Sequence, residues 1–339
     1  ANETDDGVAA TGKVRWTYNG YFWTDAGNDG NWFNTANWNT GAVPTASDNA
    51  YIDHTIKAGA FSNPVTVNAS GAVCNNLTIN AGAGTAITLS LTASGILTAN
   101  GNVSILTSNM LTFTGAGTFN VKGSFSYTGA ASTPATGTVA MTGTSGSNTI
   151  TSGNYQFYNL TVDATGAIYT LGAAVTINND LTISNGTLDV SGANFAMTAK
   201  GNWTVNGGGV FNPQAGTVTL SKSGNSTQTI TGGSFYNLVL DNATAATTAV
   251  KSLTSSCTIT GSITIGGTGT SQLNTSTYDV YIAGNWTNNS TSGLSSSSTV
   301  YLNGSTGTQL IAGTQATTFN HLTLSGAAAK NINFNEQVN

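Results

Sequence analysis

Apolar and polar residues alternate in short runs along most of the chain. Leu181 and Ile183 flank one threonine, Val218 and Leu220 flank another, and the same period recurs in many other runs. Successive side chains of a β-strand point to opposite faces, so this alternation predicts strands with one buried and one solvated face. Glycine and asparagine separate the runs and favour tight turns. No stretch longer than two turns has a helical period, so the sequence predicts an all-β protein.

A long internal repeat organises these runs. The segment 157–163 (FYNLTVD) returns at 235–241 (FYNLVLD) and, less closely, at 319–324 (FNHLTL) and 75–79 (NNLTI). The leucines shared by these segments, Leu77, Leu160, Leu238 and Leu322, recur at a nearly constant interval of roughly 80 positions. Other landmarks keep the interval, including Gly-Asn-Trp at 201–203 and 284–286. A fixed period of this kind is typical of solenoids and other repeat architectures.

Each repeat unit contains several strand-like runs, which suggests about four coils of ~20 residues. A single coil cannot bury its apolar side, whereas coils stacked ~4.8 Å apart pair their backbones and align their inward residues. The sequence therefore predicts a right-handed parallel β-helix over 58–339, made of about four units. Roughly 14 coils would give a rod ~65 Å long. Repeat-equivalent residues are expected four coils apart, and the chain is expected to end inside a coil.

Residues 1–57 differ in kind from the rest. They hold four of the six tryptophans and seven of the thirteen acidic residues. The first coil of a solenoid exposes its core and an unpaired strand edge, so a terminal cap is needed. One interpretation is that these aromatic residues form that cap. The alternative is a sugar-binding platform on Trp23, Trp32 and Trp38, whose flat rings would stack on a pyranose if they were exposed.

One block in this N-terminal segment resembles a known family. The sequence 31–48 (NWFNTANWNTGAVPTASD) is similar to the block that opens the repetitive regions of large secreted surface proteins of Bacteroidetes. The downstream phrase VTINNDLTI at 175–183 is similar to their repeats. Those proteins include adhesins exported by the type IX secretion system, some of them used in gliding motility. The resemblance implies an extracellular location and a structural or adhesive role.

Composition narrows the partners further. Only 6% of the residues are charged, the net charge is −5, and Lys plus Arg total 8. Nucleic-acid binding needs a basic surface, so nucleic acid is not an expected partner. No apolar run approaches the ~18 residues of a membrane helix, so no membrane span is expected. The two cysteines fall on well-separated coils, and no disulfide is predicted between Cys74 and Cys257.

Candidate chemistry is sparse. The segment 25–30 (DAGNDG) resembles the start of a calcium loop, which makes Asp25 and Asp29 candidate metal ligands, although the glutamate that closes such a loop is absent. The simpler interpretation is an Asn/Asp/Gly turn. In the solenoid, the repeat-equivalent Asp163 and Asp241 would lie ~19 Å apart, too far for a pair of glycosidase carboxylates. We therefore expect no enzyme and no required cofactor.

Several functions remain open at this stage. The leading hypothesis is a rigid structural or adhesive segment that contacts cell-surface or extracellular polysaccharide or protein. A carbohydrate-active β-helix is the alternative, and ice binding is a minor one, since Thr229-Ile230-Thr231 and Thr258-Ile259-Thr260 look like steps of a threonine row. End-to-end self-association is a further expectation, because an open terminal edge can pair with another copy.

Overall fold

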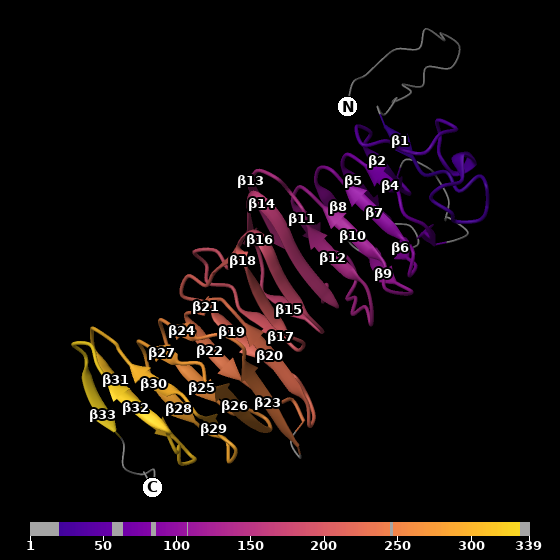
Figure 1. The fold of residues 1–339 in the computed structure, drawn as a ribbon. Coiled ribbons are helices and arrows are strands. Elements are labelled where there is room, and N and C mark those ends of the chain that lie inside the picture. The colour runs from indigo at the N-terminus through magenta and orange to yellow at the C-terminus, as the bar shows by residue number, and fades with distance from the viewer. Residues whose placement is uncertain (1–19, 56–63, 83–85, 107, 245–246, 333–339) are drawn as a thin grey trace, which may run out of the picture.

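The protein folds as an elongated stack of parallel β-strands, with the N-terminal coils at one end and the C-terminal coils at the other (Figure 1). This computed structural model describes residues 20–55, 64–82, 86–106, 108–244 and 247–332. Every ladder between its named strands is parallel, and the stack has about 12 turns. The helical content of the described residues is a short 3₁₀ turn, Thr35–Asn37. The prediction of an all-β parallel solenoid is confirmed.

Each coil crosses three faces in turn, which we number I, II and III in chain order. Face I contains β4 (Ala72–Cys74), β7 (Ile96–Ala99), β10 (Thr118–Val121), β12 (Thr138–Met141), the first halves of β14 (Asn159–Leu171), β16 (Leu181–Asp189) and β18 (Trp203–Asn212), β20 (Thr227–Thr231), β23 (Thr248–Leu253), β26 (Thr270–Ser276) and β29 (Leu294–Ser296). The strands β14, β16 and β18 continue around a corner of the coil, so their second halves lie on face II.

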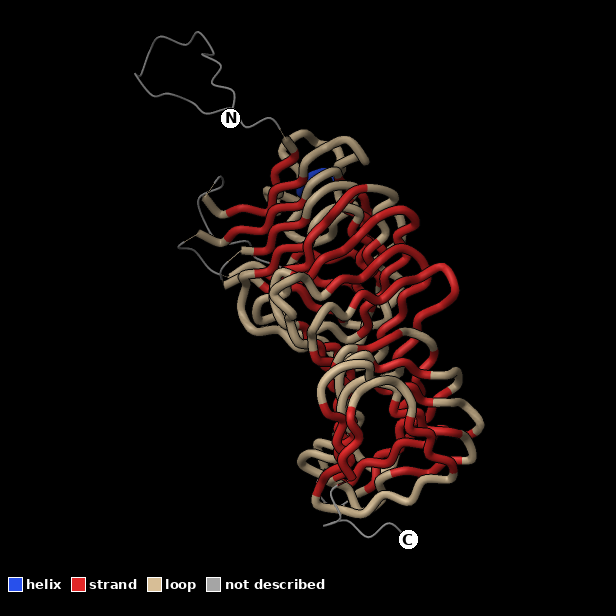
Figure 2. The backbone as a smooth tube through the Cα atoms, turned by 90° about the vertical axis from the view of Figure 1, so that its left-hand side faces the viewer, coloured by secondary structure: helices blue, strands red, loops and turns tan. Residues whose placement is uncertain are grey.

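Face II also contains β1 (Tyr21–Phe22), β2 (Ala50–Asp53), β5 (Leu77–Asn80), β8 (Val103–Ile105), β11 (Phe125–Tyr127), β13 (Gly146–Thr151), β21 (Ser234–Phe235), β24 (Cys257–Ile259), β27 (Val280–Ile282), β30 (Thr299–Leu302) and β32 (His321–Leu324). Face III contains β3 (Val65–Val67), β6 (Thr88–Leu91), β9 (Met110–Phe113), β15 (Val175–Ile177), β17 (Met197–Ala199), β19 (Thr217–Leu220), β22 (Asn237–Leu240), β25 (Ile263–Ile265), β28 (Trp286–Asn288), β31 (Thr308–Gly313) and β33 (Ala329–Ile332). Figure 2 shows the coils in tube form along the rod.

The short strands explain the alternation in the sequence. In β8, β11, β15 and β25 the first and third residues are buried, and the middle residue faces outward. The inward side chains of successive coils lie over one another and form one hydrophobic cluster that runs from Trp23 to Ile311. Burial of apolar surface is the main favourable term in folding, so each coil depends on its neighbours for its core.

The coils are longer than the sequence suggested, and their length varies. The chain takes a short path from Ile168 to its ladder partner Thr187 on the next coil, and a clearly longer one from Ala50 to its partner Leu77. The stack therefore has about 12 turns in place of the larger number of coils that the sequence predicted. The corner segments of varying length account for the difference, because they lengthen a coil without adding a strand.

The repeat does not return to the same face. Leu77 pairs with Val103 on face II, and the column continues through Phe125 and Ile150. Leu160, which follows Ile150 closely in the chain, lies on face I instead. The expectation that equivalent leucines stack four coils apart is wrong, because one repeat spans three turns plus two further faces.

The same step relates the later units. Leu160 on face I begins the column Leu181, Trp203 and Ile230, and Leu238 follows two faces further on, in face III. Leu322 then lies in face II, where it pairs with Val300. Each repeat therefore moves the shared leucine two faces beyond a whole number of turns. As a result, the leucines of successive units lie on faces II, I, III and II.

Repeat-equivalent asparagines likewise lie on a different face in each unit. On face II, the Oδ1 of Asn76 accepts from the backbone N–H of Asn102 at 2.7 Å. The repeat-equivalent Asn159 accepts from the N–H of Asp180 at 3.2 Å on face I, and Asn237 accepts from the N–H of Ser262 at 3.0 Å on face III. These side chains satisfy backbone donors at the turn before each strand, where no ladder partner is available. The asparagines that precede Leu77, Leu160 and Leu238 thus join neighbouring coils, whereas Leu322 follows His321.

The predicted boundary at residue 57 is not where the stack begins. The strand β2 already pairs with β5, from Ala50↔Leu77 to Asp53↔Asn80, and β1 pairs with β2. The residues between β1 and β2 fold over the end of the interior, and Asn31 bridges Thr66 at the start of face III. The N-terminal segment is therefore continuous with the solenoid in hydrogen bonding and also covers its first coil.

Candidate functional site

The three candidate tryptophans lie inside the cap. Trp23, Trp32 and Trp38 are exposed by only 1%, 1% and 2%. The ring of Trp38 meets the other two edge-on, with centroid distances of 5.1 Å to Trp23 and 4.8 Å to Trp32. The Nε1 of Trp38 donates to the carbonyl of Trp32 at 2.8 Å. These rings plug the end of the core, and their burial corrects the interpretation of this trio as a sugar-stacking platform.

The two candidate calcium ligands have different roles. Asp29 accepts hydrogen bonds from the backbone N–H of Asn31 at 3.0 Å and from the side-chain amides of Asn34 at 2.9 Å and Asn37 at 2.7 Å. These donors, the Asn31 N–H foremost, lower the pKa of Asp29. Asp25 has a left-handed backbone (φ 52°), and its carbonyl accepts from Asn28 at 3.0 Å.

This arrangement favours the turn interpretation over calcium. The carboxylate of Asp29 is surrounded by N–H donors, whereas a calcium ion requires oxygen ligands. The loop then enters the 3₁₀ turn Thr35–Asn37 and provides no closing carboxylate. Among the residues that the structure describes, no three His, Cys, Asp or Glu side chains are grouped in a way that could hold a metal.

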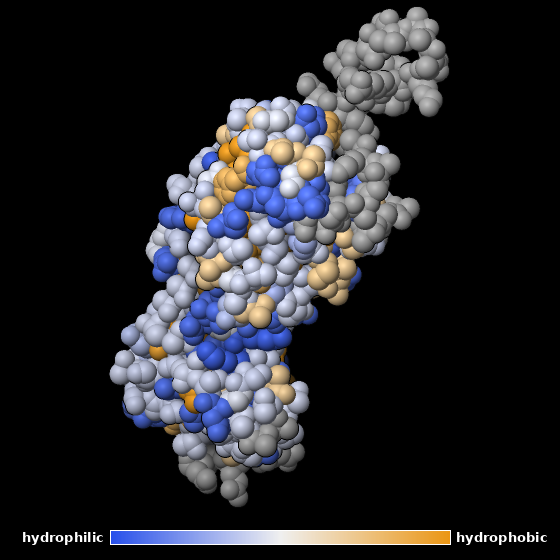
Figure 3. Space-filling model, turned by 90° about the vertical axis from the view of Figure 1, so that its right-hand side faces the viewer, coloured by the Kyte–Doolittle hydropathy of each residue, from blue (hydrophilic) through white to orange (hydrophobic). Residues whose placement is uncertain are grey.

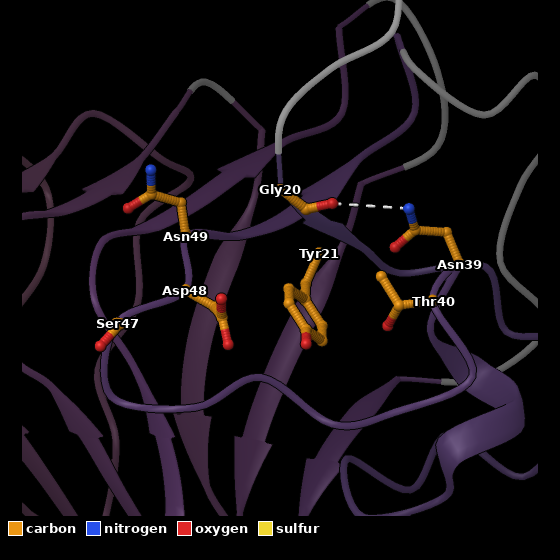
Figure 4. A pocket seen from close by; sticks show the side chains of 7 residues that line it. All are labelled: Gly20, Tyr21, Asn39, Thr40, Ser47, Asp48 and Asn49. Carbon is orange, nitrogen blue, oxygen red and sulfur yellow. Dashed lines mark hydrogen bonds between the residues drawn. The ribbon is translucent and has the colours of Figure 1, made fainter.

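A polar hollow lies beside the buried tryptophans. It has a volume of about 440 Å³ and opens between β1 and the loop that leads into β2 (Figure 4). Its lining residues are Gly20, Tyr21, Asn39, Thr40, Ser47, Asp48 and Asn49. Tyr21 supplies its aromatic ring and Asp48 its carboxylate. No sequence motif marks this site, because its members are separated by the cap segment and are brought together only by the pairing of β1 with β2.

The lining residues are fixed by the surrounding structure. The Oδ2 of Asp48 accepts from the backbone N–H of Thr45 at 2.9 Å and from its hydroxyl at 2.5 Å. The Oδ1 of Asn39 accepts from the N–H of Phe22 at 2.7 Å. The ring of Tyr21 meets Trp38 at 6.5 Å in an edge-on arrangement. The hollow is therefore pre-formed, with one acidic group and several neutral hydrogen-bonding groups.

A second missed feature is polar and internal. Gln228 and Lys251 are fully buried, and each is hydrogen-bonded to backbone carbonyls inside the solenoid. Gln309 and Lys330 repeat the arrangement one unit later. The spacing from one glutamine to the other, and from one lysine to the other, matches the repeat interval and would have revealed the feature.

The outer faces carry single rows of threonine. On face I, Thr161, Thr182 and Thr204 occupy the same outward position on three successive coils. Thr231 pairs with Thr204, and its hydroxyl lies 2.6 Å from that of Thr254 on the next coil. Around Thr161 and Thr182 the row has the width of one residue, because the residues two positions away are not threonines: Asn159, Asp163, Asp180 and Ser184. Figure 3 shows one side of the molecule as mainly pale, with strongly hydrophilic residues gathered in several patches and a hydrophobic patch near the upper end.

The Thr-Ile-Thr segments at 229–231 and 258–260 are not matched by two threonines on the neighbouring coils. Thr229 pairs with Ser252, and Thr258 pairs with Tyr281, which stacks on Tyr301 with ring centroids 4.7 Å apart. A regular two-column threonine surface is therefore absent at these two positions, which removes the main reason for expecting ice binding.

The cysteines and the repeat-equivalent aspartates of the solenoid also have structural roles. Cys74 and Cys257 are free and buried, which confirms the prediction that they form no disulfide. Asp163 accepts from the side-chain amide of Asn185 on the next coil at 2.7 Å. Asp241, its repeat equivalent, accepts from the backbone N–H of Thr268 at 3.0 Å. These two carboxylates bind different neighbours on different faces, so they do not form a pair.

Comparisons with known proteins add no further assignment. No family model, curated protein or solved structure matches this chain. In the described part of the chain, no helix has both the length and the apolar character required to cross a bilayer.

Proposed function

We propose that this chain is a rigid, non-catalytic segment of an extracellular surface protein. Its role is structural and adhesive. The observation that carries the proposal is the use of the outer carboxylates. Each of five aspartates on the rod accepts a hydrogen bond from the next coil: Asp163, Asp180, Asp189, Asp241 and Asp279. Their charges and lone pairs are engaged in joining coils rather than converging on a substrate.

Mechanical stiffness supports the same role. Parallel ladders join coil to coil along all three faces, and one hydrophobic cluster continues through the rod. About 12 turns at ~4.8 Å per turn give a length of ~58 Å. With few charges on the surface, contact with a partner would depend on hydroxyl and amide groups, which suit neutral extracellular polymers. The resemblance of the segment 31–48 to Bacteroidetes surface adhesins favours an extracellular location.

Adhesion and catalysis can be separated in one experiment. Beads coated with the full chain would be held against polysaccharide-coated surfaces under flow, and the same polysaccharides would be incubated with the soluble protein. We expect the beads to be retained and no new reducing ends to form. Release of new ends would overturn the non-catalytic role, and retention equal to that of albumin-coated beads would overturn the adhesive one.

The alternative of a carbohydrate-active protein has support in one place, the polar hollow beside Tyr21. A site with one carboxylate at the cap fits binding better than hydrolysis, which uses two carboxyl groups in most families. The hollow therefore fits a contact point of an adhesive protein better than an active site.

A further inference from the structure

We propose that the hollow lined by Tyr21, Asn39, Thr40 and Asp48 binds one sugar residue of a neutral polysaccharide. This inference rests on the proposed adhesive function and names the class of partner. It also moves the carbohydrate contact from the three buried tryptophans to the surface beside them.

The size and position of the hollow suit a ligand. Its volume of about 440 Å³ is within the range of small-molecule sites, which is roughly 300–1,000 Å³. It is open to solvent at the end of the rod, and its floor is held by the pairing of β1 with β2 and by the hydrogen bond from the Tyr21 N–H to the Asn49 carbonyl at 2.9 Å. A pre-formed site reduces the ordering cost of binding.

Tyr21 supplies the apolar contact. Its ring is half-buried, and the edge-on contact with Trp38 fixes its orientation. In Figure 4 the ring stands between Asp48 on one side and Thr40 on the other. An aromatic ring held in this way can pack against the C–H face of a pyranose, while its hydroxyl remains available for a hydrogen bond.

Asp48, Asn39 and Asn49 supply the polar contacts. Because the hydrogen bonds from Thr45 engage the Oδ2 of Asp48, its Oδ1 remains as an acceptor for a sugar hydroxyl. The side-chain amide of Asn39 makes one long bond of 3.4 Å to the Gly20 carbonyl, so it can donate to a ligand. Asn49 uses its Oδ1 for the next coil, which leaves its amide N–H groups as donors. Sugar hydroxyls both donate and accept, which matches this mixture.

The charge of the hollow selects against acidic sugars. Among its described lining residues, Asp48 carries the only charge, and none is Lys, Arg or His. A uronic acid or a sulfated sugar would bring a second negative charge near this carboxylate, with no compensating cation among the described lining residues. The expected ligand is therefore a neutral hexose or pentose unit with adjacent free hydroxyls.

The test uses the full chain and a defined panel of oligosaccharides. Cellohexaose, laminarihexaose, mannohexaose and β-1,4-galactohexaose serve as neutral probes, and hexagalacturonate serves as the anionic one, with binding measured by calorimetry. We expect at least one neutral probe to bind more tightly than hexagalacturonate. Tyr21→Ala should weaken that binding at least tenfold, Tyr21→Phe should weaken it by less than threefold, and Tyr281→Ala on a distant outer strand should leave it unchanged.

Asp48→Asn provides an independent variant. It retains a carbonyl oxygen for Thr45 but removes the charge, so binding of the neutral probe should fall and the discrimination against hexagalacturonate should shrink. Urea midpoints of all variants identify any that fail to fold. Absence of binding by every neutral probe, or equal binding by the folded Tyr21→Ala variant, would overturn the proposal. Retention of coated beads on polysaccharide surfaces in either case would show that adhesion survives without this site.

Discussion

Gln228 and Lys251 occupy neighbouring positions on the adjacent strands β20 and β23, and both side chains point into the solenoid. The Nε2 of Gln228 donates to the carbonyls of Ala199 and Gly201, and the Nζ of Lys251 donates to the carbonyl of Asp241. The carbonyl of Ala199 also accepts from the backbone N–H of Ser221 at 2.9 Å, whereas Gly201 and Asp241 lie just outside strands. Buried carbonyls without partners are costly, so this polar pair completes the hydrogen bonding of the coil.

Replacement of Gln228 by leucine should be strongly destabilising. The Gln228→Leu variant removes the side-chain partner of the Gly201 carbonyl and of the Lys222 N–H, while the Ala199 carbonyl keeps its bond from Ser221. At ~1–3 kcal/mol for each buried group left unsatisfied, partly offset by apolar burial, we expect a loss of about 2–4 kcal/mol in the free energy of unfolding. The matched control is Gln272→Leu, at an outward position on β26, with a change below about 1 kcal/mol. Equal urea midpoints for both variants would contradict this role.

Lys251 should make stability depend on pH. Burial is the main cause that lowers its pKa to about 8, opposed by the charge of Asp241 and assisted by that of Lys222. Between about pH 8 and 10.5 the unfolded chain holds a proton on this amine that the folded chain releases, so stability rises with pH through this window. The full difference is roughly 3 kcal/mol, with a slope of up to about 1.4 kcal/mol per pH unit.

The measurement is a series of urea titrations from about pH 7.5 to 9.5. Buried Tyr127, Tyr155 and Tyr169 have raised pKa values and would reduce stability at higher pH, so the series stops below their range. The Lys251→Met variant should lose the upward slope. The Lys200→Met variant, which removes a lysine bonded to Asn178 nearer the surface, should retain it. A flat profile for the unmodified protein would disprove the assignment.

Much of the fold could be predicted from sequence, because its main signal is local. The two-residue alternation in runs such as 181–183 directly records which side chains face inward. The long repeat was also visible, but its geometry was not. Whether Leu160 and Leu238 share a face depends on the number of residues used at every corner between them, and those corners have no regular pattern.

The candidate site was harder to predict for a related reason. Trp32 and Trp38 have the same sequence character whether they plug a core or line a surface, and only the packing around them decides between the two. The hollow depends on contacts between Tyr21 and Asp48, which belong to separate segments. By contrast, Gln228 and Gln309 were detectable, since the segment Thr-Gln-x-Ile recurs at the repeat interval with glutamine at an inward position of the alternation.

An aromatic cluster should hold the stack together where one ladder is interrupted. In the described residues, no ladder joins the end of β18 to β21 on face II, and Trp203, Phe211 and Phe235 pack beneath this position. Phe235→Ala should therefore cost about 3–5 kcal/mol, in the range for buried aromatic residues. Tyr236→Ala, which truncates the next and outward side chain, is the control and should cost below about 1 kcal/mol.

Coupling between the rings gives a sharper test of the same cluster. Trp203 and Phe235 lie with their ring centroids 5.2 Å apart, so a double-mutant cycle with leucine at both positions should give an interaction energy of about 0.5–1.5 kcal/mol. Amide hydrogen exchange in β21 and β24 should accelerate in either single variant. Additive effects, with exchange unchanged in these strands, would show that the interrupted ladder does not depend on the rings.

Thiol labelling should show whether the rod unfolds as one unit. Burial raises the pKa of Cys74 and of Cys257 to about 12 each, so at about pH 8 only about one thiol in ten thousand is ionised in the folded chain. A disulfide reagent should therefore react with neither thiol in native protein and with both in urea.

The Cys74→Ala and Cys257→Ala variants each leave one thiol, so they report separately on the two halves of the rod. Because both thiols belong to one continuous hydrophobic cluster, we expect them to become reactive at the same urea concentration. Labelling of one half at a clearly lower concentration would instead indicate separate cooperative units, with the interrupted ladder between β18 and β21 as the boundary.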